Sequence, residues 1–219
     1  MLPCLASLGF SAPSLTVAVD LSFGASMNLR ERRSLAKQLQ QIIGSNRHFA
    51  HPLELHFTSF EKAREEPVCL PRDEDQLRAW RRIDTLTLHD DAATSVWRPE
   101  DLVYLSPDAT TPLLSLDPRC VYVIGGIVDR QVDKGLSLDR ATELGSVARR
   151  LPIREYAERP DAHPIMNVDA CVQILGDVHN GATWQEAIAR SLPRRHLKVR
   201  ELEDAQGRKD RVLESDGGS

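Results

Sequence analysis

The sequence predicts an α/β domain in which a parallel sheet carries helices on both faces. Three observations support this fold class. Short apolar segments rich in β-branched residues alternate along the chain with segments of helical periodicity. Residues 15–60 read as a strand, a helix and a strand, which implies parallel pairing through a right-handed crossover. A chain of 219 residues with 41% hydrophobic content is also long enough to bury one sizeable core.

The first half of the chain contains the clearest β-α-β signal. A strand is expected at residues 15–22 (LTVAVDLS), where β-branched and apolar residues dominate. Asn28 and Glu31 match a capping box and predict the start of a helix. Gly44 follows the last periodic apolar residue and is expected to end that helix. A second strand is expected at residues 53–60 (LELHFTSF).

Residues 61–100 differ from the rest in being charged and interrupted by prolines. Only TLTL, at 85–88, has the pattern of an extended segment, so we expect a variable insertion on the domain surface. Trp80 and Trp97 are expected to pin this insertion to the body of the domain, rather than to stack on nucleic-acid bases.

The second half returns to a regular alternation. Strands are expected at residues 102–105, 120–126 and 147–152. Helices are expected within residues 106–116, 137–144, 168–179 and 183–193. The last helix begins with a second capping box, formed by Thr183 and Glu186. These elements define one domain at residues 15–196, preceded by a poorly ordered extension at 1–14 and followed by a polar, disordered tail at 197–219.

Composition and cysteine spacing exclude several kinds of protein. No run of about 18 apolar residues occurs, so neither a membrane span nor a membrane partner is expected. The cysteines form no CxxC pair and lie away from histidines, which predicts reduced thiols and no metal site. They are Cys4, Cys69, Cys120 and Cys171. We therefore expect an intracellular protein, in the nucleus or cytoplasm rather than the mitochondrion, because the N-terminus lacks the arginines of a transit peptide.

Although the net charge is −4, the chain contains two basic clusters, one within residues 29–48 and the other within 190–200. Phosphate groups are bound through Lys and Arg, so either cluster is a candidate nucleic-acid contact. A solvated helix face is the alternative for each cluster taken alone.

Three predicted strand ends point to one ligand-binding crevice. YLSPD (104–108), GGIVD (125–129) and RRLPI (149–153) each lie at the carboxyl end of an expected strand. In parallel α/β sheets, ligands bind beyond these ends. The glycine pair at 125–126 would let a ligand approach the backbone, although tight turns use the same pair. The sequence contains no GxGxxG, GxxxxGK[ST] or GxSxG motif.

The order of these segments resembles the tRNA purine-9 N1-methyltransferases, a monomeric branch of the SPOUT superfamily. The matching motifs are VDLSF, LAKQL, GSNR, HPLELHFTSF, YLSPD, YVIGGIVD, KGLSLDRA, ARRLPIREY, MNVDACVQIL and TWQEAIARSLPRR. The resemblance covers residues 15–196. It implies a C-terminal trefoil knot that binds S-adenosylmethionine. It also implies methyl transfer from this cofactor to N1 of a purine at position nine of tRNA, with guanine favoured over adenine.

The resemblance assigns roles to individual residues by their position in the motifs. The residues that would line the cofactor pocket are Leu105, Ser106, Gly125, Gly126, Val128, Leu151, Pro152, Met166, Asn167 and Val168. The last three would close over the adenine. Loop and core packing is the alternative role for all of them.

Asp129 is the candidate catalytic residue. Guanine N1 carries a proton at neutral pH, so a base must remove it before the nitrogen attacks a sulfonium methyl group. A carboxylate at a strand end suits this role, and partial desolvation would raise its basicity. An orienting, capping or surface-pairing aspartate is the alternative. Adenine N1 carries no proton at neutral pH, so methylation of adenine would depend less on a base.

The expected partner is tRNA, held by residues from both basic clusters and from the segment at 149–150. These residues are Lys37, Asn46, Arg47, Arg149, Arg150, Arg194 and Arg195. A capping role is the alternative for Asn46. The resemblance implies a monomer. Family members usually carry a long Lys/Arg-rich N-terminal extension that is not seen here, so we expect either a truncated isoform or a chain that a partner protein assists. Two other functions remain open: an RNA-binding scaffold subunit of a tRNA-processing complex, and a small-molecule α/β enzyme.

Overall fold

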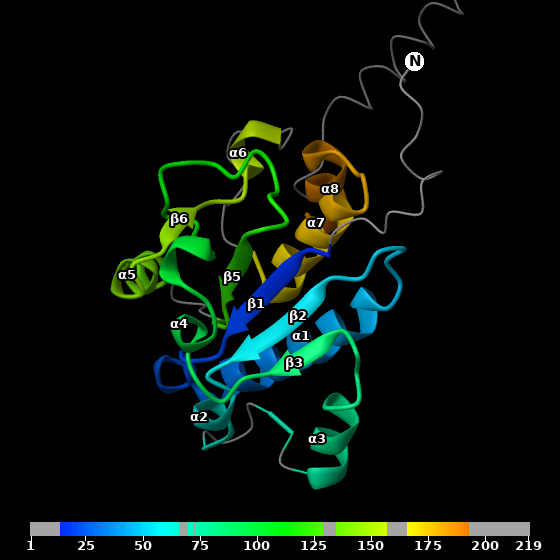
Figure 1. Ribbon diagram of the computed structural model, residues 1–219, viewed down its shortest axis with the longest axis vertical. Coiled ribbons are helices and arrows are strands. Elements are labelled where there is room, and N and C mark those ends of the chain that lie inside the picture. Colours follow the sequence, from blue (N-terminus) through cyan, green and yellow to red (C-terminus); the bar gives the residue numbers. More distant parts are fainter. Residues whose placement is uncertain (1–13, 66–69, 72, 129–134, 157–165, 193–219) are drawn as a thin grey trace, which may run out of the picture.

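The computed structural model describes residues 14–65, 70–71, 73–128, 135–156 and 166–192. Within these ranges, strands form one six-stranded sheet in the order β3-β2-β1-β5-β4-β6 (Figure 1), and every neighbouring pair is parallel. In chain order the strands are β1 (Thr16–Asp20), β2 (Glu54–Thr58), β3 (Leu86–Leu88), β4 (Leu102–Leu105), β5 (Val121–Gly125) and β6 (Val147–Arg149). The predicted parallel α/β sheet is confirmed.

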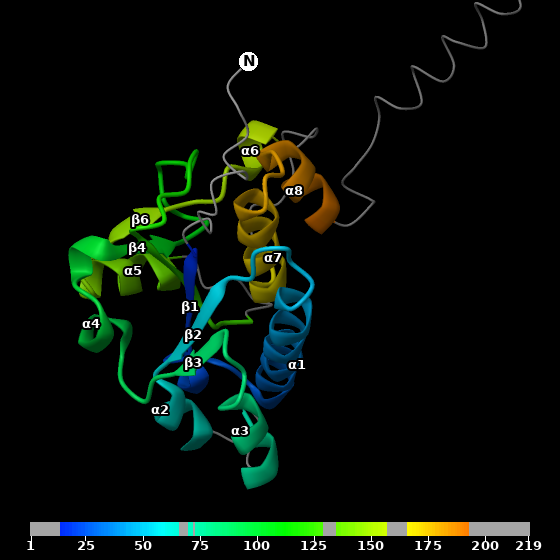
Figure 2. The same cartoon turned by 45° about the vertical axis from the view of Figure 1, so that its right-hand side comes forward.

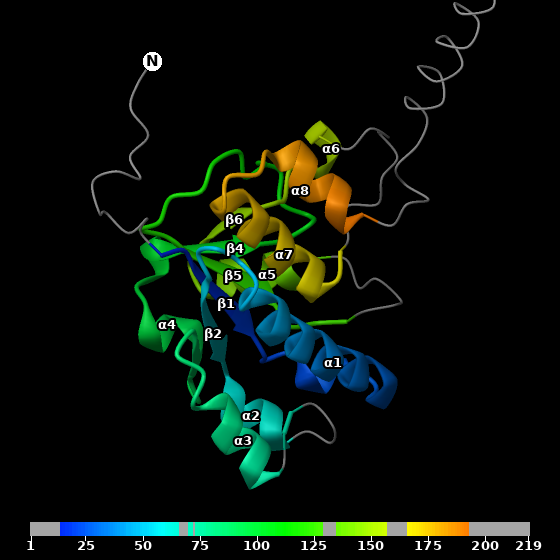
Figure 3. The same ribbon diagram turned by 90° about the vertical axis from the view of Figure 1, so that its right-hand side faces the viewer.

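Helices cover both faces of this sheet. They are α1 (Leu29–Asn46), α2 (Phe60–Glu65), α3 (Glu74–Trp80), α4 (Ala93–Val96), α5 (Leu136–Glu143), α6 (Ile153–Tyr156), α7 (Val168–His179) and α8 (Trp184–Ser191), with short 3-10 turns at Gly24–Ser26 and Pro99–Asp101. Figures 2 and 3 show α1 and α7 together on one side of β1 and β2, with α4 on the other side. The central strands are consequently buried, and Val17, Val19 and Val123 have no exposed surface.

The capping box predicted for α1 is present, but the predicted helix end is wrong. Asn28 Oδ1 accepts hydrogen bonds from two backbone N–H groups of the first turn, and Glu31 Oε2 accepts one from Asn28 N at 2.9 Å. Gly44 stays inside the helix, which continues to Asn46. Asn46 Nδ2 donates to Leu53 O and Asn46 Oδ1 accepts from Leu53 N, both at 2.9 Å. The end of α1 is therefore tied by a side chain to Leu53, the residue before β2, and is not a glycine.

Residues 61–100 are more regular than expected. They contain α3, α4 and most of α2, and β3 extends the sheet as its edge strand beside β2. Trp80 is 6% exposed and packs edge-on against Phe57, with ring centroids 5.8 Å apart. Trp97 packs edge-on against the rings of His56 and His89. Both tryptophans thus attach this segment to the sheet, as predicted.

The short helix expected within residues 106–116 is absent from that segment, all of which is described. The segment pairs with the backbone of Arg150 instead: Leu113 N donates to Arg150 O at 2.8 Å, and Arg150 N donates to Thr111 O at 3.1 Å. These bonds occupy backbone groups that a helix would use internally. The later elements match better, since α7 has the predicted bounds and Thr183 and Glu186 cap α8.

Acid is expected to destabilise the fold through the His56–His89 pair. His56 Nδ1 lies 2.8 Å from His89 Nε2, and the two rings stack. Burial and the neighbouring His89 lower the pKa of His56 from 6.5 to about 4, and burial also lowers the pKa of His89. Between pH 6.5 and about 4 the unfolded chain binds more protons than the folded chain, so stability falls as pH falls through this window. Above pH 6.5 the contribution is fully present.

The expected loss from this pair is about 1–2 kcal/mol, which allows for solvent screening of partly exposed rings. Urea unfolding at pH 7 and pH 4.5 would measure it in the wild-type chain and in a His56→Phe variant, which keeps a ring against Trp97. The variant should lose less stability on acidification. His48 is exposed, and His48→Phe should retain the wild-type pH dependence; equal pH dependence in all three proteins would contradict the assignment.

Candidate functional site

The sheet order brings three predicted ligand-binding segments to one edge. β4 lies between β5 and β6, with Leu105 in register with both Ile124 and Arg149. The chain therefore leaves the sheet at Ser106, Gly126 and Arg150 along the same carboxyl edge. Ser106 N donates to Arg149 O at 2.9 Å and joins two of these segments directly. This is the edge at which parallel α/β sheets bind ligands.

The packing around Gly126 explains why a glycine pair lies at the end of β5. The N–H of Gly126 donates to Asp20 O at 2.8 Å, so the backbone passes directly over the end of β1. A Cβ atom at this position would lie 2.8 Å from Asp20 O and 2.9 Å from Leu21 Cδ2. A backbone oxygen of the central sheet has little freedom to move away. Only glycine fits here, because the protein's own β1 occupies the space that a side chain would need.

Gly126→Ala is expected to lower the free energy of unfolding by about 1–3 kcal/mol, because the added methyl group must displace the end of β1. Urea denaturation would measure the change. Gly44→Ala is the matched control: Gly44 is helical, and a methyl group added there would meet no atom within 4 Å, so this variant should be as stable as wild type or more stable. A stable Gly126→Ala protein would contradict the close-packing argument.

A buried polar network lies beneath this edge and was not predicted from the sequence. Asp20 ends β1 and is 1% exposed. Its carboxylate accepts hydrogen bonds from Ser59 Oγ and Tyr104 Oη, both at 3.3 Å, and pairs with Arg140 Nε at 3.2 Å. Ser22 N is a fourth donor, at 3.1 Å. A buried carboxylate needs such a set of partners to remain charged at low cost.

The network holds several elements in a fixed arrangement. It links the ends of β1 and β2, the middle of β4 and helix α5. Burial, and next the charge of Asp20, raise the pKa of Tyr104 well above its usual value, so its hydroxyl stays protonated and donates. Ser59 has a φ of 56°, a left-handed conformation rare for a residue with a side chain. Its hydrogen bond to Asp20 helps to hold this strained turn.

The loop after β4 is tied to the start of α5. Asp108 Oδ2 accepts a hydrogen bond from Gly135 N at 2.9 Å, and Ser137 Oγ donates to Ser106 Oγ at 3.3 Å. Gly135 precedes α5 with a φ of 94°, which glycine adopts without strain. Ser106 is 2% exposed, so its hydroxyl serves this loop structure in the described arrangement.

The remaining residues predicted to bind the cofactor differ in their exposure to solvent. Leu105, Leu151 and Pro152 are buried, Val128 and Met166 are half-buried, and Asn167 is exposed. Val168 is 2% exposed and begins α7. Asp129, the predicted base, lies outside the described residues, as do Arg194 and Arg195.

The predicted RNA-binding residues differ in their solvent exposure and in whether their side chains are already bonded. Lys37 and Arg47 are exposed along α1 and at its end. Arg149 is half-buried, and Arg150 forms a double ion pair with Glu155 at 2.6 and 2.7 Å. Asn46 was wrongly placed in this group, because it is 1% exposed and its side chain is bonded to Leu53. The alternative capping role is not seen either, because the C-cap of α1 is Arg47 and the Asn46 amide bonds to the backbone of Leu53.

Other kinds of site find no support in the described ranges. Those residues contain no group of three or more His, Cys, Asp or Glu side chains that could hold a metal ion. None of the helices described is both long and apolar enough to cross a membrane. Burial raises the pKa of the Cys171 thiol to about 12, which disfavours a nucleophilic thiolate.

Solved structures identify the class to which this sheet belongs, the Trm10-like α/β fold. The chain superposes on the crystal structure of full-length spTrm10 in complex with SAH with a TM-score of 0.72 and 28% identity, covering 85% of this chain and 99% of that one. A dual-specific Trm10 from Thermococcus kodakaraensis gives a TM-score of 0.58 at 19% identity, covering 81% and 99% of the two chains, and supports the fold alone.

Sequence comparison then gives the family. Residues 8–197 match the model described as tRNA (guanine(9)-N(1))-methyltransferase TRM10/TRM10A, and this chain belongs to that family. It is 30% identical over 182 residues to mouse tRNA methyltransferase 10 homolog A, covering 83% of this chain and 54% of the relative. It is 32% identical over 195 residues to the Schizosaccharomyces pombe tRNA (guanine(9)-N1)-methyltransferase, covering 86% and 61%. The chain thus spans little more than half the length of these relatives.

Proposed function

We propose that this chain transfers a methyl group from S-adenosylmethionine to N1 of a purine, guanine rather than adenine, at position nine of tRNA. The observation that carries the proposal is the meeting of three predicted ligand-binding segments at one carboxyl edge of the sheet, where Leu105 is in register with both Ile124 and Arg149. Family membership and the names of the relatives support tRNA as the substrate, and the likeness to spTrm10 in complex with SAH supports the cofactor.

The residues at this edge suit such a cofactor. Gly125 and Gly126 would form the floor of the pocket, and the Ser106 and Leu151 segments, at adjacent strand ends, would form its sides. Met166 and Asn167, just before α7, would cover the adenine. When bound, S-adenosylmethionine supplies an electrophilic methyl group on a positively charged sulfur.

The proposed chemistry of the protein itself rests on Asp129. It follows the glycine pair by three residues, and its carboxylate would accept the N1 proton of guanine as the ring nitrogen becomes a nucleophile. Binding of the tRNA would use α1, on which Arg30, Arg33 and Lys37 are exposed at helical spacing on one face. Arg47 continues this basic surface beyond the helix.

The proposal includes a C-terminal trefoil knot and a monomeric enzyme that a partner protein assists. In support of the knot, the chain passes from β6 at the sheet edge back to α7, which packs on β5 and on α1 near the middle of the sheet. A nuclear or cytoplasmic location is also part of the proposal.

The test is mass spectrometry of an unmodified tRNA pool incubated with pure protein and S-adenosylmethionine, which reports modification, base and position together. N1-methylguanosine at position nine would support the proposal. If no product forms with a pool that the Schizosaccharomyces pombe relative modifies, while tRNA still binds, the chain is an RNA-binding scaffold. If neither product nor tRNA binding occurs, the proposal fails altogether.

A further inference from the structure

We infer that Gln38 is a positioning residue that fixes the cofactor-binding segment at 166–168 by capping helix α7 from helix α1; this inference rests on the proposed function. Gln38 Oε1 accepts a hydrogen bond from Val168 N at 2.9 Å, across 130 residues of sequence. Val168 is the first residue of α7, and Asn167, at the N-cap position, makes no side-chain capping bond. Gln38 therefore supplies the cap that the helix itself lacks.

The environment of Gln38 makes this bond specific. Its side chain is 5% exposed in the interface between α1 and α7, so its polar atoms need partners within the protein. Gln38 Nε2 donates to Ser34 Oγ at 3.3 Å, one turn earlier on α1. This bond orients the amide with its oxygen toward Val168. A residue without an acceptor here would leave the first N–H of α7 buried and unpaired.

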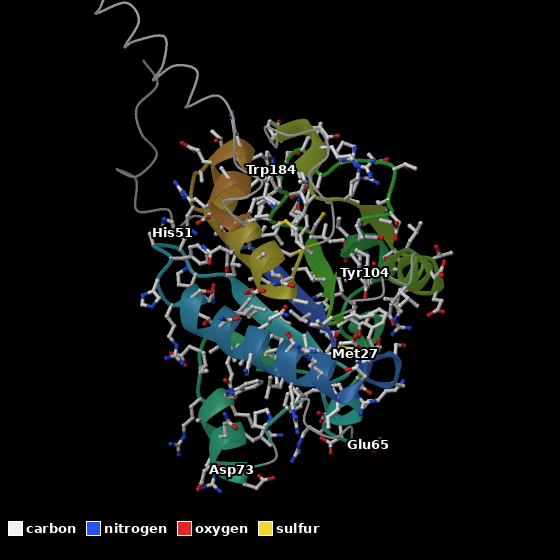
Figure 4. The ribbon with its side chains drawn as sticks, turned by 180° about the vertical axis from the view of Figure 1, so that it is seen from behind. Met27, His51, Glu65, Asp73, Tyr104 and Trp184 are labelled. Carbon is white, nitrogen blue, oxygen red and sulfur yellow. The ribbon has the colours of Figure 1, made fainter. Side chains whose placement is uncertain are left out.

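The residue just before the N-cap of α1 contacts a second predicted cofactor segment. Met27, directly before the N-cap of α1, is 4% exposed, and its Sδ accepts from Val128 N at 3.4 Å. Figure 4 shows Met27 at the start of α1, with α1 and α7 crossing the same side of the sheet. Residues 27–38 thus contact two predicted cofactor residues, Val128 and Val168. The opposite face of α1 carries the basic surface proposed for tRNA.

The positioning role predicts a selective effect on the cofactor. Gln38→Met keeps the approximate size of the side chain but removes the acceptor, so the start of α7 loses its cap. We expect the dissociation constant of S-adenosylhomocysteine and the KM for S-adenosylmethionine to rise by about 3- to 10-fold, as for a lost helix cap. The kcat and the affinity for tRNA should stay close to wild type.

Two variants serve as matched comparisons. Gln38→Glu retains an oxygen acceptor, and a carboxylate is favourable at a helix N-terminus, so cofactor affinity should recover at least in part. Gln41→Met makes the same replacement at an exposed position of α1 and should have no effect. Amide hydrogen exchange at Val168 gives a readout independent of activity: Gln38→Met should accelerate it, and Gln41→Met should not.

The experiment is isothermal titration of S-adenosylhomocysteine into the full chain and these variants, with tRNA binding and Val168 exchange measured alongside. Unchanged cofactor affinity in Gln38→Met would overturn the inference alone. A loss of tRNA affinity or of kcat without loss of cofactor affinity would also overturn it, because Gln38 would then act on the target nucleotide. If the wild-type chain binds no cofactor, the proposed function and this inference both fail.

Discussion

Replacing Asp20 with alanine is expected to lower the free energy of unfolding by about 3–5 kcal/mol, the range for removing one partner of a buried ion pair. The carboxylate receives hydrogen bonds from Ser59 and Tyr104 and pairs with Arg140. Its removal leaves the Tyr104 hydroxyl buried without its acceptor and releases the left-handed turn at Ser59. Urea unfolding followed by circular dichroism would measure the loss.

Two further variants make the result specific to the network. Asp75→Ala removes a carboxylate of an exposed ion pair on α3 and should leave stability close to wild type. Arg140→Met removes the other member of the buried pair, and the double variant Asp20→Ala, Arg140→Met should lose less than the sum of the single variants. Additive losses, or an Asp20→Ala protein that loses less than about 1 kcal/mol, would show that the network is unimportant.

Asp129→Asn is expected to slow methyl transfer to guanine by about 10²–10⁴-fold, the usual contribution of a general base. Asparagine has nearly the same size but does not accept the N1 proton. Single-turnover kinetics with excess enzyme would isolate the chemical step, and binding of S-adenosylhomocysteine and of tRNA should be retained. Alkaline pH should narrow the gap between variant and wild type, because guanine N1 then loses its proton to solvent without help.

The control for this variant is Asp75→Asn, at an exposed site on α3 with a side chain that is 85% exposed. It should show wild-type kinetics. A rate for Asp129→Asn within a few-fold of wild type would assign this residue an orienting role instead. If adenine were the methylated base, a small effect would follow directly, because adenine N1 needs no deprotonation.

Local signals in the sequence predicted individual elements well. The bounds of α7 and both capping boxes follow from residues within one or two turns of each helix end. Gly44 shows where a local rule fails. Glycine can end a helix only where the chain needs a positive φ, and the chain instead continues to Asn46, whose side chain binds Leu53. Helix α1 therefore ends where Leu53, the residue before β2, offers hydrogen-bond partners.

The candidate site was predicted only in part. The glycine pair at 125–126 is visible in the sequence, and the structure adds the reason, a close approach to Asp20 O. The roles of Asp20, Arg140 and Gln38 could not be predicted, because no motif marks them. Asp20 meets its partners across 39, 84 and 120 residues of sequence, and such pairs leave no periodic signal.

The sequence by itself determined the α/β class, the β-α-β start, both ends of α7, the capped starts of α1 and α8, and the glycine pair at 125–126. Periodicity, caps and turn residues act over a few positions, so they can be read from the sequence. The tertiary structure alone decided the strand order, the place of β3 in the sheet, the network around Asp20 and the bond from Gln38 to Val168. The strand order and the place of β3 depend on pairing between segments far apart in the sequence, and the two polar contacts depend on which buried groups that pairing brings together. A buried donor or acceptor must find a partner wherever the fold supplies one.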